Sequence, residues 1–262
     1  MHRTLADYIS AHETAFAEIA GITADLTDAQ WLVQSLCPAW TVRECVAHAV
    51  GVEKVLLGWA PSIETPPPFE VMGPWMEESP AMSGAEFNAA VAELTAARVA
   101  ELRGFDDGIA AARSITPVGP QTYGDFLRIR IFDLWVHARD VALPLGIPLP
   151  DGGATATMAL DEVNRSMGYI VGKKIGLEDG MSITVHVTGG VERDIHVAID
   201  GRAAIVDSLD KPTVELTADT ETFVMLACGR VDPQERIDAG RISWAGSDEW
   251  GDKAARNLRF TM

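Results

Sequence analysis

The chain has 262 residues and a formal net charge of −17, and 47% of its residues are hydrophobic against 23% that are charged. This balance is typical of a folded protein with a sizeable core and excludes an intrinsically disordered chain. The strong negative charge, without a cluster of Lys and Arg, argues against partners such as nucleic acid or an anionic membrane surface.

From the sequence we expect neither a transmembrane helix nor a signal peptide. No stretch has eighteen consecutive apolar residues, and Arg3 and Asp7 introduce charge too early for a signal peptide. The cysteines, Cys37, Cys45 and Cys228, are odd in number and form no C-x-x-C pair. This pattern is typical of free thiols in a reducing compartment, so we expect a cytoplasmic protein.

The first half of the sequence predicts helices. Apolar residues recur at helical spacing over residues 4–20, which predicts an amphipathic first helix. Thr41-Val42-Arg43-Glu44 has the pattern of a capping box, so a second helix is expected from Val42 to about Gly58 or Trp59, before Pro61.

Residues 60–82 contain six prolines, which predicts a long, stiff loop of the kind that often forms a lid or a binding loop. A third helix is expected over about 83–113, and a fourth from near Tyr123 to just before Pro144. Four helices with substantial connections indicate a helical bundle.

The pattern changes at residues 148–153, Pro-Leu-Pro-Asp-Gly-Gly. After one more helix, over 154–174, short alternating runs predict strands at 182–187, 195–199, 204–206, 214–216 and 242–244, with helices at 220–228 and 249–258. The predicted fold class is therefore α+β with two domains: a helical bundle over residues 1–150, and a smaller mixed α/β domain over 151–262.

The fourth predicted helix carries a polar stripe. Asp133 and His137 are four residues apart, so they can converge on one metal ion, and Asp140 lies one turn further along. An ordinary i,i+4 pair that stabilises a helix is the alternative. Asp140 opposes the helix dipole near the C-terminus, which suggests a specific partner.

These motifs resemble the mycothiol-dependent maleylpyruvate isomerase family, within the DinB-like bundle superfamily. The resemblance rests on Pro38-Ala39-Trp40-Thr41-Val42-Arg43-Glu44 with His48, and on Asp133-Leu134-Trp135-Val136-His137-Ala138-Arg139-Asp140. It implies a divalent metal, usually zinc, held by His48, Asp133 and His137, and mycothiol, an actinobacterial thiol, as cosubstrate. The family typically has Glu where this chain has Asp133. The shorter carboxylate could bind after a small helix shift, bind through water, or favour another metal.

The resemblance leads to an expected reaction in which a thiolate adds to an activated double bond. An anionic substrate needs a cation, for which the candidates are Arg230 and, with less support, Arg241; either is otherwise a surface residue. Asp140 could orient His137 or cap the following loop. Cys45, three residues before His48, could approach the metal, but the preferred interpretation is a buried apolar thiol.

Two functions are open. The first is a metal-dependent enzyme that uses mycothiol, either a cis–trans isomerase or an S-transferase, acting as a monomer or homodimer on a small-molecule electrophile. The second is a non-catalytic member of the scaffold that binds a small ligand or a partner.

Overall fold

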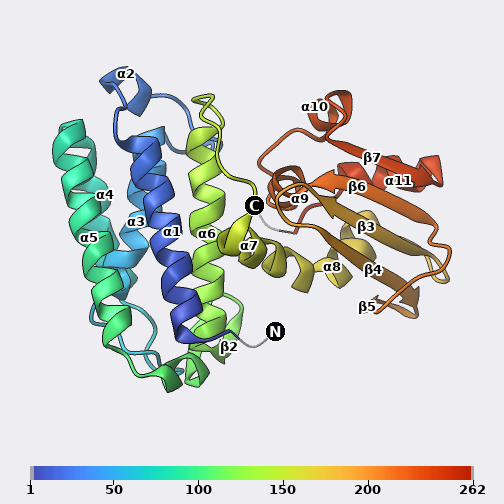
Figure 1. Cartoon of the computed structure of the whole chain (residues 1–262), viewed down its shortest axis with the longest axis horizontal. Coiled ribbons are helices and arrows are strands. Elements are labelled where there is room, and N and C mark those ends of the chain that lie inside the picture. The colour runs from blue at the N-terminus through green and yellow to red at the C-terminus, as the bar shows by residue number, and fades with distance from the viewer. Residues whose placement is uncertain (1–2, 261–262) are drawn as a thin grey trace. The chain divides into compact units, whose positions relative to one another are not determined.

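The computed structural model describes residues 3–260, and the chain forms two compact units, the first ending at Leu149 and the second beginning at Pro150 (Figure 1). The first unit is helical apart from one short hairpin, and the second contains a mixed sheet. The predicted α+β class, with a helical part followed by a mixed α/β part, is confirmed.

Long helices build the first unit: α1 (Leu5–Thr23), α3 (Val42–Leu56), α5 (Gly84–Gly104) and α6 (Tyr123–Ala142). Helices α1 and α3 each pack against both α5 and α6, and Figure 1 shows the helices running side by side. Each of them begins at a complete capping box, including the predicted one at Thr41 and Glu44. Capping satisfies backbone N–H groups locally, which explains why these helix starts can be predicted from the sequence.

The prediction of a long, stiff loop over residues 60–82 is wrong for the second half of this segment. The segment contains α4 (Met72–Glu78) between the short 3₁₀ turns Phe69–Val71 and Ser79–Ala81. Pro74 lies in the first turn of α4, where its missing N–H breaks no helical hydrogen bond. Trp75 is buried, and its Nε1–H donates to the backbone oxygen of Ala47 at 2.7 Å. The segment therefore packs against α3 as part of the core.

The third predicted helix is too long. Helix α5 ends at Gly104, and the chain continues through the 3₁₀ turn Asp107–Ala111 into the antiparallel strands β1 (Arg113–Thr116) and β2 (Gly119–Thr122). These strands are too short for an alternating pattern to show in the sequence. A further short helix, α2 (Asp28–Trp31), was also not predicted.

His12, on α1, is fully buried, and its Nδ1–H donates to the backbone oxygen of Tyr8 at 2.8 Å. Burial lowers the pKa of His12 to about 4, although the nearby Glu53 carboxylate acts in the opposite direction. The unfolded chain therefore binds this proton more readily, so stability is lost as pH falls from 6.5 towards 4. We expect the free energy of unfolding to fall by about 2 kcal/mol more between pH 7 and pH 5 in the wild type than in His12→Gln.

Urea titrations followed by tryptophan fluorescence measure this difference. His186→Gln is the control for the loss of a histidine elsewhere, because His186 is partly exposed on the second unit. Equal slopes for the wild type and His12→Gln would contradict the prediction.

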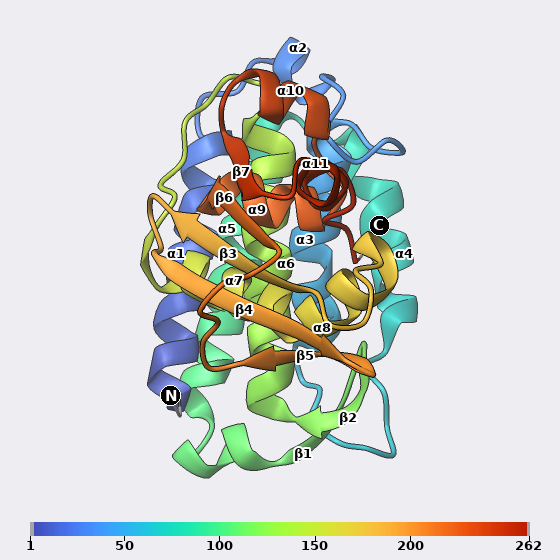
Figure 2. The ribbon, with the colours of Figure 1, turned by 90° about the vertical axis from the view of Figure 1, so that its right-hand side faces the viewer.

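The second unit is built on a five-stranded sheet with the order β5-β4-β3-β6-β7. Strands β3 and β6 run parallel and the other neighbours run antiparallel; Figure 2 shows the strands lying side by side. The strands are β3 (Ser182–Thr188), β4 (Arg193–Asp200), β5 (Arg202–Val206), β6 (Val214–Asp219) and β7 (Ile242–Gly246). Every strand predicted in this half of the sequence is present.

The helices of the second unit are α7 (Gly153–Arg165), α8 (Met167–Tyr169), α9 (Thr220–Ala227), α10 (Pro233–Asp238) and α11 (Asp248–Arg256). The helix predicted over 154–174 is interrupted at Ser166 and ends in a π-helical turn, Ile170–Ile175. None of the helices within residues 3–260 combines the length and the apolar character needed to cross a bilayer.

Candidate metal centre

The structure brings together the three residues proposed as metal ligands. His48 comes from α3, and Asp133 and His137 come from successive turns of α6; one ligand atom from each lies within 4.8 Å of the others. Asp133 Oδ1 is 3.4 Å from His137 Nε2. The rings of His48 and His137 are 5.2 Å apart between centroids, and Trp40 stacks on His48 at 4.3 Å.

The distance between Asp133 and His137 fits two ligands of a tetrahedral metal. Zinc bonds of about 2.0–2.2 Å to nitrogen and oxygen place neighbouring ligand atoms about 3.4 Å apart, which is the distance found between Asp133 and His137. Asp133 is one-third exposed, and His48 is half-buried, whereas His137 is buried. Two imidazoles and one carboxylate with an accessible side form the kind of three-ligand set that leaves a coordination position for a substrate.

Arg130 fixes the orientation of the Asp133 carboxylate. Its guanidinium donates to Asp133 Oδ2, which leaves Oδ1 facing His137. The same guanidinium donates to Glu53 Oε1 at 2.8 Å and to the backbone oxygen of Ala49 at 3.0 Å. Arg130 thus fixes the carboxylate of Asp133 relative to α3, and its positive charge competes with a cation for that carboxylate.

The pKa shifts are those of a site suited to a cation. Burial and the positive charge of His137 lower the pKa of His48 to about 4, so its nitrogen lone pair is available near pH 7. Burial alone would raise the pKa of Asp133. The positive charges of His137 and Arg130 have the larger effect and lower this pKa below its ordinary value, so the Asp133 carboxylate stays ionised. Burial opposes the charged form of His137, but Asp133 and Asp140 outweigh it and raise its pKa. A cation that binds here therefore replaces a proton on His137.

Asp140 lies behind His137. Its Oδ2 accepts a hydrogen bond from His137 Nδ1 at 2.9 Å, which directs Nε2 towards Asp133 and His48. A carboxylate on the far nitrogen of a ligating histidine is the usual outer partner of a metal site, since it fixes the tautomer and the ring orientation.

The predicted substrate cations lie in the second unit. Arg230 follows α9, and its backbone N–H donates to the backbone oxygen of Met225 at 2.9 Å. Arg241 forms a bidentate ion pair with Asp219, both contacts being 2.8 Å, and also lies 3.5 Å from Glu221. Two carboxylates therefore already neutralise Arg241.

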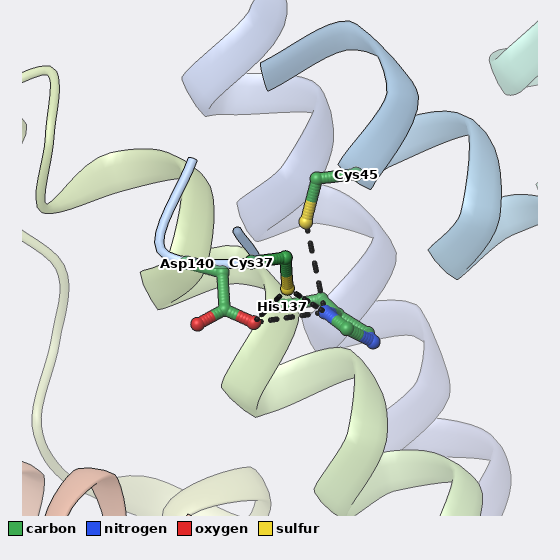
Figure 3. A group of neighbouring side chains, drawn as sticks. All are labelled: Cys37, Cys45, His137 and Asp140. Atoms are coloured by element: carbon green, nitrogen blue, oxygen red, sulfur yellow. Dashed lines mark hydrogen bonds and ion pairs between the residues drawn. The ribbon is translucent and has the colours of Figure 1, made fainter. Parts of the chain in front are cut away.

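Both cysteines of the first unit lie against His137 (Figure 3). Cys37 Sγ is 3.9 Å and Cys45 Sγ 3.6 Å from His137 Nδ1. The interpretation of Cys45 as a buried thiol agrees with its burial, but it overlooked this contact. The only local signal was the spacing of three residues between Cys45 and His48; nothing in the sequence places Cys37 there.

Comparisons with known proteins cover almost the whole chain. The family model for the mycothiol maleylpyruvate isomerase N-terminal domain matches residues 12–142, and the model for the C-terminal domain of the same family matches residues 157–255. The sequence matches no curated protein.

Two of the solved structures that match this chain are mycothiol-dependent maleylpyruvate isomerase structures with the same fold. The crystal structure of the mycothiol-dependent maleylpyruvate isomerase is 14% identical, with a TM-score of 0.63, and the match covers 98% of this chain and 97% of that one. A histidine-to-alanine mutant of the mycothiol-dependent maleylpyruvate isomerase matches at 15% identity, with a TM-score of 0.61 and the same coverage of both chains.

Proposed function

Because the chain belongs to the mycothiol maleylpyruvate isomerase family, we propose that it is a metal-dependent enzyme that uses mycothiol to isomerise a small anionic electrophile of the maleylpyruvate type. The observation that carries this proposal is the convergence of His48, Asp133 and His137 within 4.8 Å, with one side accessible. A zinc-like ion held by these residues would supply a Lewis acid that keeps a thiol ionised near neutral pH.

The surrounding residues would prepare the site for this chemistry. His48 is neutral at pH 7 and can donate its lone pair, while Asp140 and Arg130 hold His137 and Asp133 in orientation. Trp40, stacked on His48, restricts the motion of that ring. We propose that Arg230 contributes a positive charge for the substrate carboxylate.

The proposed reaction conserves its atoms and electrons. The thiolate adds to one carbon of the cis double bond, and the π electrons move to the conjugated carbonyl oxygen, giving an enolate. Rotation about the resulting single bond follows. The enolate electrons then re-form the double bond as the carbon–sulfur bond breaks, which gives the trans isomer and returns the thiolate. An S-transferase would retain the carbon–sulfur bond, and protonation of the enolate would complete that reaction.

Incubation of the purified, zinc-loaded protein with maleylpyruvate and mycothiol tests the proposal, with chromatographic separation of the cis and trans isomers. We expect turnover that requires the thiol and falls to the background rate in His48→Ala, because His48 supplies one of the three ligands. His186→Ala, a substitution on β3 in the second unit, should keep full turnover. Thiol-independent turnover, or full activity of His48→Ala, would refute the proposal.

A non-catalytic binding protein is the second candidate. The ion pair between Arg130 and Asp133 favours this candidate, because Arg130 competes with a metal for the Asp133 carboxylate. The family typically has the longer Glu at this position. This candidate predicts that zinc and mycothiol bind without turnover of maleylpyruvate or of other conjugated electrophiles. Thiol adducts of such electrophiles, formed without isomerisation, would instead indicate the S-transferase.

A further inference from the structure

The two nitrogens of His137 face two different sets of ligand atoms. Nε2 faces Asp133 and His48, the set assigned above to the proposed enzyme. Nδ1 faces the opposite way, towards Cys37, Cys45 and Asp140, and one ligand atom from each of these residues and His137 lies within 4.8 Å of all the others (Figure 3). All members of this second set are buried.

The distances within the second set are close to those of a tetrahedral metal site. His137 Nδ1 is 2.9 Å from Asp140 Oδ2, 3.6 Å from Cys45 Sγ and 3.9 Å from Cys37 Sγ, and Cys37 Sγ is 3.1 Å from Asp140 Oδ2. Bonds of about 2.3 Å to sulfur and 2.0–2.2 Å to nitrogen and oxygen correspond to ligand separations of about 3.4–3.8 Å. The shorter contacts are hydrogen bonds, whose protons a metal would replace.

The backbone around Cys37 holds it in this position. The N–H of Leu36 donates to the backbone oxygen of Asp140 at 3.0 Å, which ties the loop before α3 to α6. The N–H of Cys37 donates to Ser35 Oγ at 3.1 Å, and the N–H of Trp40 donates to the backbone oxygen of Cys37 at 3.0 Å. Cys45 lies in the first turns of α3 and is fully buried. The ligands are therefore supplied by a loop and two helices that are fixed relative to each other.

We propose that Cys37, Cys45, His137 Nδ1 and Asp140 form a second, closed metal site for zinc or a similar thiophilic ion. Two thiolates and an imidazole prefer such ions over hard cations. Four protein ligands leave no position for a substrate, so this site would not serve the thiol chemistry proposed above.

The closed site and the open site share one side chain, His137. When Nε2 of His137 binds an ion, Nδ1–H donates a hydrogen bond to Asp140. When Nδ1 binds an ion, Asp140 becomes a ligand of that ion instead. Both ions would bind the same imidazole ring, one on each nitrogen, and their positive charges would repel each other. We therefore expect one ion per chain, and an ion in the closed site would withdraw His137 from the enzyme.

Titration of the full-length protein with Co²⁺ tests this proposal, because thiolate ligands give a charge-transfer absorption in the near ultraviolet and the open site contains no sulfur. We expect this absorption in His48→Ala, where the open site is disabled, with about one ion per chain. It should disappear in the Cys37→Ser, Cys45→Ser double variant and persist in Cys228→Ser, the matched control for a buried thiol in the second unit.

X-ray absorption of zinc-loaded His48→Ala provides a measurement that does not depend on the folding of the cysteine variants. Sulfur neighbours at about 2.3 Å from zinc are expected. A zinc shell of nitrogen and oxygen alone, or no charge-transfer absorption with Co²⁺, would overturn the proposal. Neither result bears on the enzyme, whose test is thiol-dependent turnover.

Discussion

Replacing His137 by alanine is expected to remove both metal binding and turnover. The imidazole faces Asp133 through Nε2 and Asp140 through Nδ1, so its loss takes one ligand from the open set and one from the closed set. Loss of an outer partner of a metal site typically costs roughly 10–100-fold in affinity, and loss of a direct ligand should cost more. We expect zinc affinity to fall at least about a thousandfold, on the order of 4 kcal/mol.

Competition with a chelating dye measures the affinity, and elemental analysis after gel filtration gives the stoichiometry. Because His137 is buried, His137→Gln is tested alongside as a variant that fills more of the space. His186→Ala controls for the removal of a histidine elsewhere, on β3. Wild-type zinc affinity in a folded His137→Ala protein would show that neither ligand set binds the metal.

Replacing Glu53 by glutamine is expected to destabilise the first unit by about 3–5 kcal/mol. Glu53 is fully buried between two arginines: Oε2 is 3.2 Å from Arg98 Nε, and Oε1 is 2.8 Å from an Arg130 nitrogen. Burial acts to raise the pKa of Glu53, but the charges of Arg130 and Arg98 lower it overall, so the side chain is ionised. Removing this charge leaves two buried guanidinium groups that the remaining carboxylates, Glu101 and Asp133, only partly compensate.

Chemical denaturation followed by tryptophan fluorescence reports mainly on the first unit, since Trp31, Trp40, Trp59, Trp75 and Trp135 lie in it. Glu13→Gln is the matched control, because Glu13 pairs with Arg103 on the surface. Such exposed pairs contribute at most about 1 kcal/mol. A loss of less than this in Glu53→Gln would mean that water or relaxation of the arginines compensates for the missing charge.

The Glu53 network also connects stability to the proposed site. Arg130 contacts Glu53 on α3 and Asp133 on α6. The same guanidinium therefore stabilises the packing of these two helices and orients Asp133, a proposed metal ligand. No local pattern in the sequence indicates a role for Glu53. Its partners Arg98 and Arg130 are 45 and 77 residues away, and a single sequence carries no signal for such pairings.

The elements that could be predicted are those fixed by neighbouring residues. The capping box at Thr41 and Glu44 is satisfied within a single turn, and Asp133 and His137 share a face because of helical spacing alone. The alternation of apolar and polar residues predicted the strands of the second unit, because this pattern too is set by neighbouring residues. His48 was assigned through the resemblance to a family, since the spacing of residues along one helix says nothing about a ligand on another.

Tertiary packing decided the rest. The segment 60–82 folds onto α3 because Trp75 finds a hydrogen-bond acceptor at Ala47, and no local pattern indicates this contact. Cys37 and Cys45 meet His137 across 100 and 92 residues of chain. The sequence by itself therefore determined where the long helices of the first unit begin, which residues share a face and which family the chain resembles. Only the folded structure decided which side chains surround the two nitrogens of His137, because burial and long-range hydrogen bonds arise from the packing of distant segments.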